Sequence, residues 1–334
     1  MSTGPQTIVM VLPNDGPGGM QSQARLLTEG LRNAGEHVVL AVGGESRENE
    51  VTLAPFSLRS LWSFASALRR LVRESQASVL HAHGLRLAPA LLMVPRVRRV
   101  ITCHGIDPEK LPRMLFRLLR WSRMSVVACG AMPAEILRAH GVNCTVINNA
   151  IDIATTSRTR AEFDAHFGTN ASDVVALWPA RFSRQKGHDR LLDIVEATAN
   201  VPLHVVCCGE GPLRDEIVTE IARRGLSQRV SVRDYEAHAS EWLSACDLMI
   251  IPSRWEGQPL VALEALAARL PVVSLIPSDL DVTVVTSTQE ASEKIINWFG
   301  GQGEKPENSG LSDEARQLHS PQFLVSSYRS LYSS

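Results

Sequence analysis

A short stretch in the second half of the chain combines acidic, glycine and proline residues in a pattern suited to phosphate and sugar binding. Residues 254–267 read Arg-Trp-Glu-Gly-Gln-Pro-Leu-Val-Ala-Leu-Glu-Ala-Leu-Ala between two apolar, strand-like runs. Pro259 fits the first position of a helix, where its missing N–H costs nothing, and Gly257 lets the backbone approach a ligand closely. The free N–H groups at this helix start, around Gln258 and Leu260, suit a phosphate.

Two glutamates flank this predicted helix start. Glu256 precedes it, and Glu264 follows Pro259 by five residues, which corresponds to about 7.5 Å along the axis at about 1.5 Å per residue. The spacing suits a nucleotide sugar, with its diphosphate at the helix start, its ribose beside Glu264 and its sugar beside Glu256. The alternative for Glu264 alone is a glutamate on the solvated side of a surface helix, but the two glutamates together are more specific.

Two glutamates separated by seven residues in a Glu-Gly-x-Pro-Leu context resemble the signature of the retaining glycosyltransferases of family 4. This resemblance implies the GT-B fold, in which two doubly wound parallel-sheet (Rossmann-like) domains face a central cleft. It extends over roughly 7–332 and implies a reaction that needs no obligatory metal or other cofactor. The donor would be a UDP- or GDP-sugar, and the acceptor a hydroxyl of a saccharide or lipid-linked molecule.

The alternation of strand-like and helix-like segments independently predicts a parallel α/β architecture. In the first half, strands are predicted at 7–12, 36–42, 79–84, 99–103, 124–129 and 144–147, with helices at 20–33, 58–74 and 131–140. In the second half, strands are predicted at 174–178, 203–208, 230–233, 248–251 and 271–275, with helices at 188–198, 213–224, 239–245 and 259–270. Two such alternations predict two domains whose ligands bind at the carboxyl ends of the strands.

We divide the chain on the same pattern. Residues 1–152 are expected to form an acceptor-side domain, and residues 173–318 a nucleotide-sugar-binding domain. The polar, aperiodic run 153–172 is expected to be the linker between them. A last helix within 319–334 is expected to cross back to the N-terminal domain.

Several residues at predicted strand ends match the family by position. The resemblance implies that Gly18 and Gly19 face donor and acceptor, that His104 lies near the donor sugar, and that Arg181 and Lys186 hold the donor diphosphate. It also implies that Gly209, Glu210 and Tyr235 lie near the nucleotide. Without the resemblance, His104 would be a structural loop histidine, and the basic pair a solvated loop.

His81 and His83 form a His-x-His pair that invites a metal-site interpretation. No third ligand lies close in the sequence, and the family commonly carries such histidines here, so we expect no metal site. Six cysteines fall mostly in apolar runs without a Cys-x-x-Cys pair, which indicates buried thiols in a reducing compartment. The net charge of -1 gives no general basic field for nucleic acid.

The N-terminus lacks the layout of a signal peptide, and no apolar run approaches the length of a membrane span. We therefore expect a cytoplasmic protein whose membrane contact, if any, is peripheral. Residues 86–125 hold nine basic and two acidic residues, a net charge of +7, and 111–121 interleave arginines with apolar side chains. A basic amphipathic helix can lie in an anionic membrane interface. An ordinary packed helix with a basic outer face would show the same pattern.

The resemblance weakens over residues 274–281. There the family usually has a glycine pair and a second acidic position, whereas this chain reads Ser-Leu-Ile-Pro-Ser-Asp-Leu-Asp. Besides a retaining glycosyltransferase of bacterial surface polysaccharide synthesis, two alternatives remain open at this point. They are a nucleotide-sugar 2-epimerase-like enzyme and a nucleotide-sugar-binding protein without catalysis.

Overall fold

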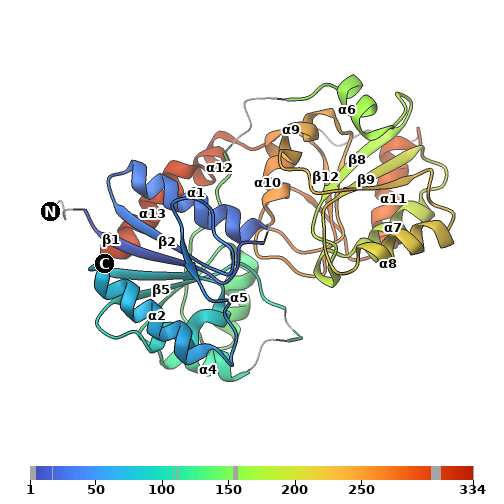
Figure 1. Cartoon of the computed structure of the whole chain (residues 1–334). Helices are drawn as coiled ribbons and strands as arrows, with labels where there is room; N and C mark the ends of the chain where they lie inside the picture. The colour runs from blue at the N-terminus through green and yellow to red at the C-terminus, as the bar shows by residue number, and fades with distance from the viewer. Residues whose placement is uncertain are drawn as a thin grey trace. The chain divides into compact units, whose positions relative to one another are not determined.

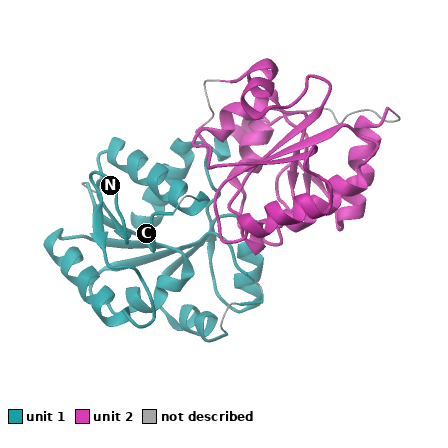
Figure 2. Cartoon of the chain, turned by 45° about the vertical axis from the view of Figure 1, so that its right-hand side comes forward, with its two compact units in different colours: residues 1–150, 317–334 teal, residues 151–316 magenta. Residues whose placement is uncertain are grey.

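The chain folds as two compact units, residues 1–150 with 317–334 and residues 151–316 (Figure 2). The computed structural model describes residues 5–16, 18–107, 109–110, 113–152, 157–301 and 310–333. The return of the chain at Gln317 brings the last helix, α13 (Pro321–Ser333), into the first unit.

The first unit is built on a seven-stranded parallel sheet in the order β3-β2-β1-β4-β5-β6-β7. The strands are β1 (Thr7–Leu12), β2 (His37–Gly43), β3 (Val51–Leu53), β4 (Val79–His83), β5 (Arg98–Cys103), β6 (Ser125–Ala128) and β7 (Thr145–Val146). The register places His81 on β4 opposite Val100 on β5, and His83 opposite Thr102. Polar residues at the carboxyl ends of these two strands are therefore neighbours.

Helices cover both faces of this sheet (Figure 1). One face carries α1 (Gly19–Asn33) and α13, and the other carries α2 (Leu61–Glu74), α3 (Ala88–Leu92), α4 (Arg113–Trp121) and α5 (Ala131–Ala139). Strand β1 supplies both cores, because its side chains alternate between the two faces. Ile8 and Met10 pack toward α1 and α13, while Val9 and Val11 pack toward the other four helices.

Close packing fixes α13 against α1. A Cβ atom on Gly30 of α1 would lie 2.4 Å from Val325 Cγ2, so only glycine permits this approach. Leu324, Tyr328 and Tyr332 of α13 are buried in the same core as Val325. The last helix is therefore an integral layer of the first unit.

The second unit contains two groups of three parallel strands, in the orders β10-β9-β8 and β11-β12-β13. A parallel bridge between Ala176 and Leu248 connects the two groups. The strands are β8 (Val174–Pro179), β9 (Leu203–Cys208), β10 (Val230–Arg233), β11 (Met249–Ile251), β12 (Val272–Ser274) and β13 (Thr283–Val284). The helices are α6 (Arg160–Phe167), α7 (His188–Ala197), α8 (Arg214–Arg223), α9 (Ala239–Trp242), α10 (Leu260–Ala267), α11 (Thr288–Phe299) and α12 (Asp313–Leu318), of which α12 reaches the boundary with the first unit.

The prediction of a linker over 153–172 is wrong for much of its length. Residues 153–156 lie outside the described ranges, but α6 follows them and packs within the second unit. A capping box begins this helix: Thr159 accepts a hydrogen bond from the Glu162 N–H, and the Glu162 carboxylate accepts one from the Thr159 N–H. Phe163 and Phe167 are buried beside Trp242. Two aromatic residues in one helix are too few for the periodicity of the sequence to reveal.

Candidate active site

Three side chains from two loops of the second unit meet around the carboxylate of Glu256. Lys186 Nζ lies 2.6 Å from Glu256 Oε1, and Ser253 Oγ donates to the same oxygen at 2.8 Å. Gln185 Nε2 donates to Oε2 at 3.2 Å. Glu256 is buried, and the Lys186 side chain is 23% exposed. The structure thus joins two predicted site residues in one ion pair and adds two neighbours, Gln185 and Ser253, that the sequence analysis did not select.

Backbone contacts hold the loops that carry this cluster. Gly187, with φ +64°, ends the loop after β8, and a Cβ there would lie 2.2 Å from the Pro252 carbonyl oxygen in the loop after β11. Gly209, with φ +152°, begins the loop after β9, and its Cβ would lie 2.5 Å from the Ala180 carbonyl oxygen. Arg254 N–H also donates to the Gln185 carbonyl at 2.8 Å. Three loops at the carboxyl ends of parallel strands are thereby tied together, which is where ligands bind in such sheets.

The helix start after Glu256 differs by one residue from the prediction. Pro259 is the N-cap of α10, with φ −69° and ψ 121°, and the helix begins at Leu260. Pro259 is extended rather than helical, and none of the described side chains caps the helix. Among the first-turn N–H groups, that of Ala262 donates to the Pro259 carbonyl at 3.1 Å, so those of Leu260 and Val261 are the ones available to an anion. Gln258, just before them, is 5% exposed and its amide lies 3.5 Å from Asp279 in the atypical segment.

Glu264 lies half-buried on α10 between the buried residues Leu263 and Ala265. Burial raises the pKa of its carboxyl to about 7. Among the described residues, none forms a hydrogen bond or ion pair with this carboxylate. A carboxylate whose pKa is raised by desolvation in this way is a candidate for a functional site.

The remaining predicted residues of the second unit lie at its surface. Arg181, Glu210 and Tyr235 are exposed, Tyr235 by 56%, and each follows a parallel strand. Gly257 is half-buried between Glu256 and Gln258. These positions are accessible to a ligand at the same end of the sheet as the Lys186–Glu256 pair.

In the first unit, Gly18 is the N-cap of α1, and the helix begins at Gly19. Both glycines are exposed, and no described side chain caps the helix. Gln21 Nε2 donates to Asn14 Oδ1 at 2.6 Å and so holds the preceding loop against the first turn. The glycine loop thus presents open backbone N–H groups at the carboxyl end of β1.

His104, directly after β5, lies beside His83 at the end of β4. His83 Nδ1 and His104 Nε2 are 2.7 Å apart. Burial lowers the pKa of His104 to about 4 and that of His83 well below its usual range. At neutral pH both imidazoles are uncharged, so His104 can offer a hydrogen bond to a ligand but no positive charge.

The metal-site interpretation of the His-x-His pair does not fit the contacts of His81. Its Nδ1 lies 2.7 Å from Tyr332 Oη and its Nε2 lies 2.8 Å from Thr102 Oγ1, so both ring nitrogens already have protein partners. Within the described ranges, no group of three histidine, cysteine or acidic side chains is arranged to hold a metal ion.

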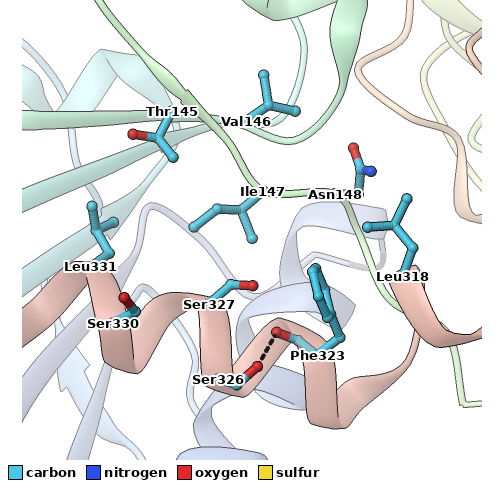
Figure 3. A pocket seen from close by; sticks show the side chains of 10 residues that line it. All are labelled: Thr145, Val146, Ile147, Asn148, Leu318, Phe323, Ser326, Ser327, Ser330 and Leu331. Carbon is cyan, nitrogen blue, oxygen red and sulfur yellow. Dashed lines mark hydrogen bonds between the residues drawn. The ribbon is translucent and has the colours of Figure 1, made fainter.

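A separate pocket of about 510 Å³ lies in the first unit between the end of β7 and α13 (Figure 3). Ile147 and Thr145 line one side, and Phe323, Ser327 and Leu331 of α13 line the other. It contains none of the predicted site residues, so we do not assign it to the reaction.

Two family models match the chain. The model described as Glycosyltransferase Family 4 matches residues 17–155, and the model described as Glycosyl transferases group 1 matches residues 173–291. Together they span most of both units. The chain therefore belongs to the family 4, group 1 glycosyltransferases, and the resemblance inferred from the sequence is confirmed.

Individual curated relatives share about a third of their residues or fewer with this chain over the aligned region. The chain is 32% identical over 215 residues to the lipopolysaccharide core biosynthesis mannosyltransferase LpsB of Rhizobium meliloti, a match of 59% of this chain and 58% of that protein. It is 29% identical over 150 residues to the alpha-D-kanosaminyltransferase of Streptomyces kanamyceticus, which covers 43% of this chain and 37% of that protein. The chain therefore spans about half the length of these curated relatives or less.

The fold matches solved structures over nearly its whole length. Anabaena HepE in complex with UDP and glucose has a TM-score of 0.82 at 19% identity, covering 98% of this chain and 99% of HepE. A glycosyltransferase from Rickettsia africae has a TM-score of 0.79 at 14% identity, covering 99% and 98%. At these identities the likeness shows the fold alone. The predicted GT-B class, with two Rossmann-like units, is confirmed.

Proposed function

We propose that this protein is a retaining glycosyltransferase that moves a sugar from a nucleotide-diphosphate sugar to a hydroxyl of a saccharide or lipid-linked acceptor. The observation that carries the proposal is the cluster around Glu256, where a buried carboxylate, Lys186 and an open helix start meet at the carboxyl ends of parallel strands. The HepE structures with UDP and with UDP-glucose support a UDP-sugar as the first donor to test. The name of LpsB supports a role in bacterial surface polysaccharide synthesis.

In this proposal the second unit stabilises the leaving group. Arg181, Lys186 and the N–H groups from Leu260 onward face the negative charge that develops on the departing diphosphate. Preorganised charges and dipoles of this kind often supply the largest catalytic term. Lys186 pairs with Glu256 and so holds the carboxylate in place. Its other N–H groups have no hydrogen-bond partner among the described residues and are available for phosphate oxygens.

Glu256 and Glu264 bind the two ends of the donor. Glu256 accepts hydrogen bonds from hydroxyls of the transferred sugar, and Glu264 accepts them from the ribose. Ribose hydroxyls would give the Glu264 carboxylate the partners that the protein does not provide, and so would favour its charged form. Gly209, Glu210 and Tyr235 border the nucleotide, and no metal ion is required.

The first unit supplies His104 and the Gly18–Gly19 loop. His104 lies near the donor sugar and the reaction centre, where its neutral imidazole gives a directed hydrogen bond. The open N–H groups of the loop lie at a strand end suited to donor and acceptor oxygens.

A thermal-shift series with UDP-, GDP- and ADP-sugars tests donor binding. A ligand at 100 times its dissociation constant adds about 2.7 kcal/mol of stability, which a melting curve resolves. The matched control is Glu264→Gln, which should need more of the same nucleotide sugar for the same shift. Release of free sugar from the stabilising donor, with and without acceptor, then distinguishes a transferase from a protein that only binds. Absence of any shift with all three donors contradicts the proposal.

We further propose that the enzyme is cytoplasmic and contacts anionic membrane through the basic segment 86–125. The exposure of the α4 side chains supports this proposal: Phe116 and Leu119 are buried in the core, while Met114 and Trp121 are 78% and 77% exposed. Seven basic residues of the segment are exposed, namely Arg86, Arg96, Lys110, Arg113, Arg117, Arg120 and Arg123. Arg98 is half-buried and donates to the Tyr332 carbonyl. Residues 108 and 111–112 lie outside the described ranges, and the described helices include none long and apolar enough to cross a bilayer.

Vesicle flotation tests this contact. The protein should float with vesicles that contain phosphatidylglycerol and remain at the bottom with phosphatidylcholine alone, since each basic residue near an anionic surface contributes about 1 kcal/mol. Replacing Arg113, Arg117 and Arg120 by glutamine should reduce recovery. The control replaces Arg158, Arg223 and Arg269 of the second unit by glutamine, which removes the same amount of positive charge and should leave recovery unchanged. Equal recovery with both lipids shows that α4 is an ordinary packed helix with a basic outer face.

A further inference from the structure

His104 forms a side-chain hydrogen bond with His83, and among the described side chains no other one bonds to a ring nitrogen of His104. The rings are 5.0 Å apart between centroids and inclined by 25°. This bond takes up Nε2 of His104. The nitrogen that remains for a ligand is therefore Nδ1.

The ring of His83 has little freedom to move. The residue is 1% exposed, and the ring of His81 lies against it with centroids 4.4 Å apart. His81 is itself fixed at both nitrogens by Tyr332 and Thr102. Because His83 is fixed in this way, its hydrogen bond can hold the half-buried imidazole of His104 in one orientation.

Thr102 and the C-terminal helix complete this support. Tyr328 Oη lies 2.8 Å from Thr102 Oγ1, and its ring lies 5.1 Å from that of His81. Tyr328 and Tyr332 are both buried, so α13 contributes two hydroxyls to the interior of the sheet. The packing behind His83 thus depends on the last turns of the chain.

Counting protons selects one arrangement of the two imidazoles. Both are neutral at neutral pH, so each carries one N–H, and one of these lies in the bond between them. His83 Nε2 is buried and has no hydrogen-bond partner among the described residues. If His104 donated, His83 would carry its own N–H on this atom, and buried N–H groups without an acceptor are rarer than unpaired acceptors. If His83 donates from Nδ1, the unpartnered atom holds only a lone pair.

We propose that His83 is a positioning residue that donates its Nδ1–H to His104 Nε2 and so fixes the proton of His104 on Nδ1. His104 then presents an N–H donor, in a single orientation, to a ligand oxygen. The consequence for turnover rests on the function proposed above, whereas the position of the proton does not.

The first test locates the proton in the folded protein without any substrate. Long-range ¹H–¹⁵N spectra of protein labelled at its ten histidines separate protonated from unprotonated ring nitrogens, and His104→Gln assigns the relevant signals. We expect the His104 proton on Nδ1. A proton on Nε2 of His104, or exchange of the proton between its two nitrogens, overturns the proposal. This test needs only the wild-type protein and the assignment variant.

The second test removes the donor. His83→Leu should release His104 into a mixture of tautomers, whereas His83→Asn, whose amide lies near the former Nδ1, should retain the Nδ1–H form. The signals of His188, buried in the second unit, should not change in either variant. An unchanged His104 pattern in His83→Leu contradicts the proposal, and if that variant does not fold, His83→Gln, whose amide lies near the former Nε2, takes its place.

Kinetics separate this inference from the proposed function. With a donor that passes the thermal-shift test, His83→Leu should lower kcat by about tenfold and leave the donor KM nearly unchanged, and His83→Asn should restore most of the rate. A purely structural role predicts instead that the two variants lose activity in proportion to their melting temperatures, and that result counts against the proposal. If His104→Ala retains full turnover, the reaction role of His104 is wrong while the tautomer result still stands.

Discussion

In the second unit the Lys186–Glu256 pair carries charge and joins two loops, whereas in the first unit the His83–His104 pair consists of neutral imidazoles at the ends of adjacent strands. Lys186 and Glu256 come together because glycines let three loops touch backbone to backbone. His83 and His104 come together because β4 and β5 are paired in register. The charged cluster suits an ionic leaving group. The neutral pair can give a directed hydrogen bond without placing a fixed charge beside the ligand.

The largest effect is expected from the charged cluster. Glu256→Gln removes the charge that would face the sugar as it becomes positive, so kcat should fall by about 10²–10³-fold. Nucleotide binding measured by calorimetry should stay near the wild-type value. Ser253→Ala is the matched control, since it removes one hydrogen bond to Glu256 but keeps the charge, and it should cost much less. Loss of nucleotide binding in Glu256→Gln would falsify the assignment to the sugar.

In the neutral pair, His104→Ala should lower turnover by roughly ten- to hundredfold, because it removes a directed hydrogen bond at the reaction centre. The melting temperature should change little, since His104 is only half-buried. Steady-state rates at saturating donor, with melting curves of the same samples, check both statements. Near-native turnover would reduce His104 to a structural residue.

Glu264→Gln should chiefly raise the donor KM. The ribose hardly changes during the reaction, so its contacts are similar in the ground and transition states. Loss of hydrogen bonds to a charged acceptor costs about 1.5–3 kcal/mol, or on the order of ten- to hundredfold in KM. Initial rates across a range of donor concentrations measure it, and an unchanged KM contradicts the ribose assignment.

The pH dependence of the melting temperature of the same variant should report the burial of Glu264. The pKa of this carboxyl rises from its ordinary value of 4.5 to about 7 in the fold. The stability that its neutral form contributes is fully present below pH 4.5 and is lost as pH rises through 7. Glutamine cannot ionise, so the melting temperature of Glu264→Gln minus that of the wild type should increase from pH 4.5 to 7.5. A constant difference would show that Glu264 is solvated after all.

The smallest effect concerns the support of the neutral pair. Tyr328→Phe removes the hydroxyl that lies 2.8 Å from Thr102 Oγ1 and leaves the ring in place. Loss of one such hydrogen bond should cost about 1 kcal/mol. Calorimetric melting of the free protein should show a small decrease, and the affinity for nucleotide, which the proposal assigns to the second unit, should not change. A loss of nucleotide affinity would show that the two regions are not independent.

The sequence by itself determined the fold class, most of the regular elements and the choice of site residues. Strand and helix periodicity is a local property, and it located β1, β8, β9 and β10 almost residue by residue. Residues 254–267 identified the family because loop chemistry at a helix start is also local. The sequence analysis missed β3, α3, α6, α11, α12 and β13. All of these except the 12-residue α11 are eight residues long or shorter, and such short segments give little periodic signal.

Only the tertiary structure decided which site residues touch. Lys186 and Glu256 are 70 residues apart, and His81 and Tyr332 are 251 apart. Such contacts depend on the order of strands in the sheets and on the return of α13 to the first unit, and periodicity carries no information about either. The tertiary structure also distinguished two glutamates that look alike in the sequence. Glu256 is held by three side chains, whereas Glu264 is desolvated and no described residue pairs with it. Burial and pairing differ because they are set by neighbours from distant parts of the chain.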